Sequence, residues 1–284
     1  MDVLNFVKMH GAGNDFILID DRGERIPEER KGELVRRLCV RRFSVGADGV
    51  LFVCRSERCD VRMRVFNADG SEAEMSGNGI RCFARYVYER GIVRRRRFDV
   101  ETLGGVITPE VLEDGAVRVF MGRPSFQMLN EDFHVDGYGH FKLTALSIGN
   151  PHAVLIVRSF DEVDVAGLGR AIECHKAFPN RTNVNFVVID GENEISVRTY
   201  ERGVGETLSC GTGSTASALT LAKLHLVDTR RPILVHTQGG DLTVEVLGDA
   251  ENGAYLTGPA EEVFEGRIRL GRLLHDVSHA LRFA

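Results

Sequence analysis

The sequence lacks any long apolar run. No stretch of its 284 residues reaches the roughly 20 apolar residues that a helix needs to cross a bilayer. The first ten residues include Asp2, Asn5, Lys8 and His10, so they lack the apolar core of a secretory signal. We therefore expect a cytoplasmic protein with no membrane partner.

The sequence also lacks the paired cysteines of a typical zinc site. Only Cys54 and Cys59 lie close together among the six cysteines, and no CxxC pair occurs. In a chain of this length without a signal peptide, the cysteines are expected to be free thiols. None of the five lysines lies in a context typical of a pyridoxal Schiff base. We expect neither a metal nor a cofactor.

The charge balance gives no strong excess of one sign. The formal net charge is −5, which offers no electrostatic basis for binding nucleic acid or an anionic membrane. The basic run Arg94 to Arg97 is interpreted as a solvated turn. With 43% hydrophobic residues the chain can bury a sizeable core, as one large domain or two moderate ones. A small-molecule partner is the default expectation.

Several segments recur about 135 residues apart, which indicates an internal duplication. Residues 13–19 run from a Gly-Asn turn into an apolar strand, and residues 149–156 repeat that pattern. Residues 102–112 are echoed by residues 237–247. Each copy contains strands punctuated by glycine turns around a helical pattern.

The predicted fold is therefore α/β (α+β) with two pseudo-symmetric halves. Each half is expected to be a curved mixed or antiparallel sheet, or a barrel, wrapped around a central helix, with the active site in the cleft between the halves. The N-terminal half is expected to comprise 1–120 plus about 257–268, and the C-terminal half 121–256. Residues 269–284 are expected to form an amphipathic helical extension, interpreted as a packing helix or, alternatively, as a dimer contact.

Two glycine-rich loops occupy equivalent places in the repeat. Ser76-Gly77-Asn78-Gly79 and Cys210-Gly211-Thr212-Gly213 each precede a helical pattern, and a glutamate stands four residues before each loop. A helix N-terminus presents unpaired N–H groups and a positive dipole end, which bind a carboxylate and lower the pKa of a thiol. Two such loops facing one α-carbon have the geometry of two-base racemisation.

Other interpretations of the loops are weaker. The region from Gly205 to Thr215 has no lysine ahead of its Ser/Thr, as a phosphate-binding P-loop requires, and Gly203-Val204-Gly205 lacks the third glycine of a dinucleotide fingerprint. A glycine turn that merely caps a core helix remains an alternative for either loop alone.

From Met9 to about Ile268 the sequence resembles the diaminopimelate epimerases. The motifs that carry the resemblance occur in the family's order: residues 9–16 (MHGAGNDF), 45–49 (VGADG), 67–72 (NADGSE), 149–152 (GNPH), 200–203 (YERG) and 209–213 (SCGTG). The resemblance implies a cytoplasmic isomerase, commonly a homodimer, of lysine and peptidoglycan precursor synthesis. It converts LL-2,6-diaminopimelate to the meso form without pyridoxal phosphate, using two cysteines as acid and base.

The resemblance also implies the site residues. Cys210 is one of the catalytic pair, and His152 and Glu201 tune the cysteine pKa values. The residues that would bind substrate are Asn14, Asn67, Gly77, Asn78, Asn150, Asn183, Glu201, Arg202, Gly211 and Thr212. Each asparagine alone is also consistent with a turn residue that bonds its own backbone.

Ser76 stands where the family has its first catalytic cysteine. A hydroxyl is a far weaker base than a thiolate unless another base activates it. Three explanations are weighed: a Cys→Ser change engineered to block turnover, a natural variant with one-base chemistry such as an amino-acid racemase or hydroxyproline dehydratase, and an amino-acid-binding protein without turnover. The distal binding residues favour the first, with epimerisation impaired as the chain is written.

Overall fold

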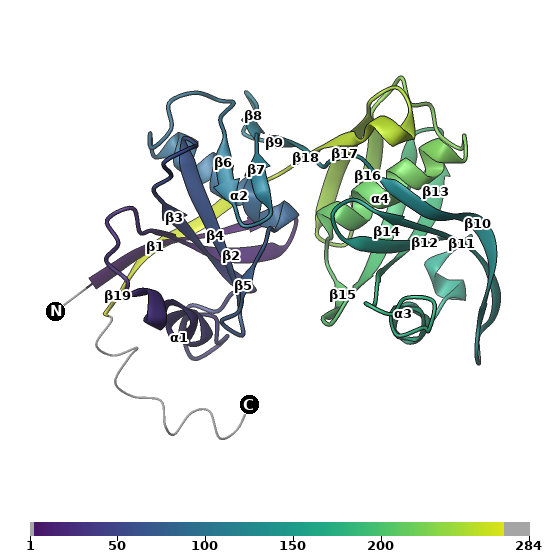
Figure 1. Cartoon of the computed structure of the whole chain (residues 1–284), viewed down its shortest axis with the longest axis horizontal. Coiled ribbons are helices and arrows are strands. Elements are labelled where there is room, and N and C mark those ends of the chain that lie inside the picture. Colours follow the sequence, from purple (N-terminus) through teal and green to yellow (C-terminus); the bar gives the residue numbers. More distant parts are fainter. Residues whose placement is uncertain (1–2, 270–284) are drawn as a thin grey trace. The chain divides into compact units, whose positions relative to one another are not determined.

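A computed structural model describes residues 3–269, which divide into two compact units (Figure 1). The first unit contains residues 3–117 and 260–269, and the second contains residues 118–259. The helical extension predicted for 269–284 lies outside the described residues from position 270 onward. No helix within residues 3–269 is long and apolar enough to cross a membrane.

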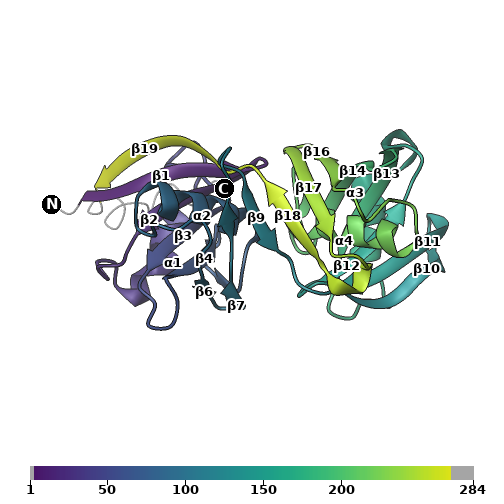
Figure 2. The ribbon, with the colours of Figure 1, turned by 90° about the horizontal axis from the view of Figure 1, so that it is seen from above.

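The first unit is built on one sheet, with the strand order β19-β1-β2-β3-β4-β6-β7 and β5 paired with β4. The strands are β1 (Val3–Gly11), β2 (Asn14–Asp20), β3 (Gly49–Cys54), β4 (Val61–Asn67), β5 (Glu72–Ala73), β6 (Val100–Thr102), β7 (Gly105–Ile107) and β19 (Glu261–Arg269). Figure 2 shows β19 alongside β1, with which it pairs antiparallel. The last described strand is thus the edge strand of this sheet and lies next to the first strand of the chain.

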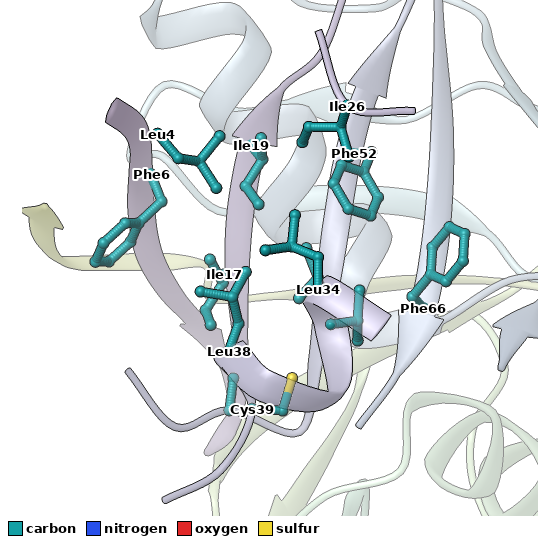
Figure 3. Close-up of a cluster of buried hydrophobic side chains, with 13 residues drawn as sticks. Leu4, Phe6, Ile17, Ile19, Ile26, Leu34, Leu38, Cys39, Phe52 and Phe66 are labelled. Carbon is teal, nitrogen blue, oxygen red and sulfur yellow. The ribbon is translucent and has the colours of Figure 1, made fainter. Parts of the chain in front are cut away.

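Helix α1 (Glu28–Leu38) covers one face of this sheet and α2 (Gly77–Glu89) the other. Because side chains alternate along a strand, Val50 and Phe52 of β3 join the cluster of α1, whereas Leu51 lies beside the first turn of α2. Figure 3 shows Phe52 in this cluster. Leu34 and Leu38 carry the α1 side of the cluster. Burial of each such side chain contributes roughly 1.5–3 kcal/mol.

The second unit repeats this plan. Its main path is β10-β11-β12-β13-β14-β16-β17-β18, with β15 paired with β14. The strands are β10 (Ser125–Val135), β11 (Gly139–Ser147), β12 (Pro151–Ile156), β13 (Asn183–Gly191), β14 (Glu194–Glu201), β15 (Gly205–Thr207), β16 (Ile233–Thr237), β17 (Gly240–Val246) and β18 (Ala254–Gly258). The short strands β8 (Glu110–Val111) and β9 (Val117–Phe120) lie where the chain passes from one unit to the next.

Two helices flank the second sheet as well. Helix α3 (Val165–Glu173) packs on Val184 and Phe186 of β13. Helix α4 (Gly211–Lys223) lies on the opposite face, against β11 to β14 and β16 to β18. Two 3-10 turns, η1 (Phe160–Glu162) and η2 (Ala250–Asn252), complete the unit.

The strand pairings confirm the predicted pseudo-symmetry. In both units the successive pairs are antiparallel, antiparallel, parallel, antiparallel, parallel and antiparallel, counted from β19 and from β10. Over residues 3–269 each strand order is an open path, so the expected curved mixed sheet is correct and the closed-barrel alternative is wrong.

Candidate active site

Ser76 is the N-cap of α2. Its backbone is extended (φ −137°, ψ 123°), and its Oγ accepts a hydrogen bond from the N–H of Gly79 at 3.0 Å. The first turn of α2 contains no acidic residue, so no carboxylate of its own offsets the positive helix end. A Cβ at Gly79 would lie 3.0 Å from the Cβ of Ser76, a tight contact that a small shift relieves. This end of α2 is therefore suited to an anionic group.

Two of the predicted binding asparagines lie together beside this helix end. The Nδ2 of Asn78 donates to Oδ1 of Asn14 at 3.4 Å, and the Nδ2 of Asn14 donates to Oδ2 of Asp48 at 2.8 Å. Arg41 bridges Asp48 and Asp15, and its guanidinium together with the ammonium of Lys8 holds the pKa of Asp15 below its usual value despite partial burial. Because the Asp48 carboxylate accepts hydrogen bonds, it fixes the Asn14 amide with its Nδ2 toward Asp48.

The predicted residue Asn67 lies at the end of β4. Its Nδ2 donates to Oγ of Ser71 at 3.1 Å, and its backbone N–H bonds the Ser71 carbonyl. The Asn67 side chain thus bonds a neighbouring side chain in its turn and not the backbone, and the residue is exposed. Its role in binding stays a prediction.

Cys210 holds the same position on α4. Its backbone is extended (φ −124°, ψ 109°), and its Sγ accepts from the N–H of Gly213 at 3.4 Å. The sulfur also lies 3.4 Å from Oγ1 of Thr212. The two loop residues predicted as helix N-termini, Ser76 and Cys210, are thus both N-caps of 13-residue helices.

The expectation that the helix end lowers the pKa of Cys210 is wrong for this structure. Burial raises the pKa of the thiol, and the neighbouring Glu201 carboxylate raises it further, against the lowering effect of Thr212 and the Gly213 N–H. A helix dipole contributes roughly 0.3–1 kcal/mol. Full burial shifts a pKa by up to roughly 3–5 units, so burial outweighs the dipole. The raised pKa of Cys210 favours the protonated thiol over the thiolate.

Glu201 is placed to take that proton. Its carboxylate forms a hydrogen bond with the Cys210 thiol, and its Oε1 accepts from the hydroxyl of Thr207 at 2.6 Å. Moving the proton from Sγ to Glu201 would leave a thiolate beside two hydrogen-bond donors. The geometry therefore supplies the cysteine with its own base.

The remaining predicted binding residues of the second unit lie at the ends of neighbouring strands. The Oδ1 of Asn183 accepts from the backbone N–H of Arg202 at 3.0 Å, and its Nδ2 donates to the Pro151 carbonyl at 3.0 Å. The guanidinium of Arg202 is exposed and donates from Nη1 to the Asn180 carbonyl at 3.2 Å. A guanidinium in this position is able to grip a carboxylate with two parallel hydrogen bonds.

His152 is fully buried and neutral. Burial, together with the positive charge of Arg202, lowers its pKa to about 3. Its Nε2 lies 3.0 Å from Oδ1 of Asn150, whose Nδ2 donates to Oγ1 of Thr212 at 3.3 Å. His152 therefore reaches Cys210 through Asn150 and Thr212, not by contact. Its predicted role in tuning the thiol remains a prediction.

The sequence analysis missed Asn185 and Thr199, which lie behind the Cys210 loop. Thr199 Oγ1 donates to Oδ1 of Asn185 at 3.0 Å, and both residues are buried. The signal was present: Asn183 and Asn185 are two apart in an apolar strand, so both polar side chains point to one face. Two amides on the inner face of a strand indicate a buried polar site.

The structure thus collects the predicted residues into two groups. Ser76, Gly77, Asn78 and Asn14 lie together in the first unit. In the second, the residues around α4 and the ends of β12 to β14 are Asn150, His152, Asn183, Glu201, Arg202, Cys210, Gly211 and Thr212. That both groups act on one substrate stays a prediction. Among residues 3–269 no three His, Cys, Asp or Glu side chains gather as metal ligands.

The family model described as "Diaminopimelate epimerase" matches residues 6–127 and 144–263. The chain is 50% identical to a protein of that name from Methanothermobacter thermautotrophicus, over 92% of this chain and 97% of the relative. It is 47% identical to another from Caldanaerobacter subterraneus, over 94% and 100% of the two chains.

Solved structures with the same fold are more distant in sequence. A phenazine biosynthesis protein of the PhzF family from Bacillus anthracis superposes with a TM-score of 0.74 at 19% identity, over 95% of this chain and 100% of that one. A hydroxyproline epimerase from Agrobacterium vitis gives 0.72 at 17% identity, over 94% and 92%. At these identities the likeness concerns the fold alone.

Proposed function

The chain belongs to the diaminopimelate epimerase family, and from this premise we propose that it inverts one α-carbon of LL-2,6-diaminopimelate, with Cys210 as the competent proton-transfer group. It is an isomerase, and its substrate is a small amino acid. The observation that carries the assignment of Cys210 is its place at the N-cap of α4, bonded to Gly213 N–H and paired with Glu201.

The proton of the Cys210 thiol passes to the Glu201 carboxylate, and the thiolate then takes the hydrogen of the α-carbon as a proton. The electron pair of the broken C–H bond is left on the α-carbon and delocalises onto the substrate carboxylate. N–H groups at a helix end stabilise the charge that grows on those oxygens. Inversion is complete when a second group returns a proton to the opposite side.

Ser76 holds the position proposed for that second group. Its hydroxyl accepts from the Gly79 N–H, and among residues 3–269 no carboxylate or imidazole forms a hydrogen bond with it. A serine hydroxyl without an activating base is a weak acid and a weaker base. We propose that the chain as written therefore exchanges the α-hydrogen of one stereoisomer with solvent and inverts it slowly.

The test is hydrogen exchange in D2O. LL- and meso-diaminopimelate are incubated with the protein, and deuterium at the α-carbons and the ratio of stereoisomers are followed by NMR and chiral chromatography. We expect deuterium uptake at one centre to run well ahead of inversion. Cys210→Ala should abolish uptake, whereas Cys174→Ala, which removes an exposed cysteine, should not. Uptake that survives Cys210→Ala would mean that another base acts.

A one-base superfamily enzyme is the second candidate, because Ser76 replaces the expected cysteine. A panel of free amino acids including proline, hydroxyproline and histidine, run on the chain and on its Ser76→Cys variant, separates the two. Acceptance of proline or hydroxyproline with rejection of diaminopimelate would favour the second candidate. Binding of diaminopimelate without any exchange in either protein would favour a binding protein.

We also propose a homodimer and a reducing, cytoplasmic location. The dimer is supported by Val263 and Phe264, which are exposed on β19 at the end of the first sheet's strand order. Analytical ultracentrifugation tests it, and a monomer at micromolar concentration would contradict it. The location is supported by the six cysteines, all free in the structure.

A further inference from the structure

A continuous line of hydrogen bonds runs from the interior of the second unit to the sulfur of Cys210. It passes from Asn185 Nδ2 to His152 Nδ1 (3.2 Å), from His152 Nε2 to Asn150 Oδ1 (3.0 Å), from Asn150 Nδ2 to Thr212 Oγ1 (3.3 Å), and from Thr212 Oγ1 to the sulfur (3.4 Å). Asn185, His152, Asn150 and Thr212 are each able to donate or to accept a hydrogen bond. The hydrogen bonds along the line could therefore all be donated in either of two directions.

We infer that Asn185 is a positioning residue: it fixes the tautomer of His152 and thereby makes the Thr212 hydroxyl donate to the sulfur of Cys210. The inference rests on the proposed function of Cys210. Through this arrangement the sulfur of Cys210 gains a hydrogen-bond donor. The role of Asn185 does not depend on contact with the substrate.

The orientation of the Asn185 amide is settled by two further neighbours. Its Nδ2 donates to the Ala153 carbonyl at 3.2 Å, and a carbonyl is only able to accept. Its Oδ1 accepts from Thr199 Oγ1 at 3.0 Å. Turning the amide over would set its oxygen against the Ala153 oxygen. Because Asn185 is fully buried, no water is at hand to compensate such a mismatch, which costs roughly 1–3 kcal/mol.

The direction of the rest of the line follows from this amide. His152 Nδ1 faces an N–H donor, so it is the acceptor, and the single proton of the neutral ring is on Nε2. Nε2–H donates to Oδ1 of Asn150, which leaves the Nδ2 of Asn150 to donate to Thr212. The Thr212 oxygen is then an acceptor from Asn150, and its own hydrogen points to the sulfur.

The sulfur therefore has two donors and one acceptor around it. The Gly213 N–H and the Thr212 hydroxyl donate to it, and Glu201 is the carboxylate that receives its proton. Both donors favour the thiolate. The charged groups that bear on the line are Glu201 at the sulfur and Arg202 near His152. A reversed line would remove one of the two donors from the thiolate.

The first measurement is made on the unchanged protein. Long-range ¹H–¹⁵N correlation spectra of histidine-labelled protein separate the tautomers, and the His152 signal among the nine histidines is identified by its loss in His152→Gln. We expect a proton on Nε2 alone across about pH 5 to 8, the range in which an ordinary histidine titrates. A proton on Nδ1, or a charged ring, would overturn the inference before any variant of Asn185 is made.

The second measurement uses Asn185→Leu, with Thr199→Val as the matched control. Asn185→Leu removes the N–H donor to His152 Nδ1. Thr199→Val leaves the Nδ2 of Asn185 bonded to the Ala153 carbonyl and to His152 Nδ1. We expect Asn185→Leu to give a mixture of His152 tautomers and to move the midpoint of Cys210 alkylation by iodoacetamide up by about one pH unit, the scale of one lost hydrogen bond to a charged group. Thr199→Val should change neither.

The two readouts need no turnover, so they separate this inference from the proposed function. A single unchanged tautomer and an unchanged alkylation midpoint in Asn185→Leu would show that Asn185 only stabilises the fold. A fixed Nε2 tautomer in a protein that exchanges no α-hydrogen would keep the positioning role and reject the catalytic one.

Discussion

The two helix N-termini have the same backbone and different layers behind them. Ser76 and Cys210 are both extended N-caps whose side chains accept from the third residue of a 13-residue helix. Behind the first lies Leu51 of β3, and at the equivalent register of β13 behind the second lies Asn185. The duplication has kept the scaffold and changed the chemistry beneath it.

The same contrast holds one strand further along. Val65 of β4 is buried and apolar, whereas its counterpart Thr199 of β14 is buried and bonded to Asn185. Phe16 pairs with Gly49 where His152 pairs with Asn183. Within residues 3–269, the buried polar line through Asn185 and His152 therefore belongs to the second unit and leads to its N-cap. A shared turn geometry therefore stands on two different buried layers, one apolar and one polar.

The largest expected effect comes from making the two N-caps alike. Ser76→Cys should raise the rate of LL-to-meso conversion about 10²- to 10⁴-fold, the usual contribution of a positioned acid or base. Chiral chromatography of the two stereoisomers measures it. The control is the double variant Ser76→Cys with Cys210→Ser, which moves the thiol from the second N-cap to the first. Its LL-to-meso conversion should stay slow. A Ser76→Cys variant no faster than the parent would reject position 76 as the second group.

Exchanging the layers behind the N-caps should change stability unequally. Leu51→Asn removes a fully buried apolar side chain and leaves an amide without partners, at about 4 kcal/mol in unfolding free energy. Asn185→Leu leaves His152 Nδ1 and the Thr199 hydroxyl unpaired, at about 2 kcal/mol. Urea unfolding compares them. Equal losses of unfolding free energy in the two variants would mean that the difference between Leu51 and Asn185 has no consequence for stability.

The third residues of the two helices sharpen the contrast further. A Cβ at Gly213 would lie 2.3 Å from Asn185 Oδ1 and 2.9 Å from Thr199 Oγ1, whereas at Gly79 it would lie 3.2 Å from Leu51. We expect Gly213→Ala to cost about 2 kcal/mol through overpacking. Gly79→Ala should be near neutral, because the helix propensity of alanine, about 1 kcal/mol over glycine, offsets the strain. Thermal unfolding of both variants settles whether the polar layer is the tighter one.

Much of this scaffold was predictable from the sequence because duplication writes the same pattern twice. The repeated Gly-Asn turn and the two glycine loops predicted paired halves and paired N-caps, and both are confirmed. The glutamates four residues before each loop turn out to be ion-pair partners of equivalent arginines, Arg64 with Glu72 and Arg198 with Glu206. They stabilise the hairpins that lead into the loops.

The chemistry was less predictable because it depends on burial. The sequence places Cys210 at a helix end, which favours a thiolate, but it does not show that the residue is only 6% exposed or that it lies beside Glu201. Asn185 was missed for the same reason, since a polar residue in a strand signals a network only once its inward neighbours are known. Long-range packing, not local pattern, sets both.

The smallest expected effect tests the electrostatic difference between the two N-caps. Glu201 raises the pKa of Cys210, whereas the first unit has the neutral Asn67 at the matching end of β4. Glu201→Gln removes a negative charge from beside the sulfur, so the thiolate becomes easier to form and the midpoint of Cys210 alkylation should fall, by about one pH unit. Mass spectrometry of the Cys210 peptide against pH measures it.

The raised pKa of Cys210 also makes the unfolding free energy depend on pH. A thiol whose pKa is raised by folding stabilises the protein below the pKa of the unfolded thiol, about 8.5, and this stabilisation is lost as pH rises above it. Glu201→Gln should therefore flatten part of the fall in unfolding free energy at alkaline pH, and Cys210→Ala should remove that part. The matched control is the cysteine introduced by Ser76→Cys, at an N-cap whose helix has no acidic residue in its first turn, which should alkylate at lower pH than Cys210. If the two cysteines alkylate with the same midpoint, burial and not Glu201 dominates, and the contrast between the two N-caps lies in the polar line behind Cys210 alone.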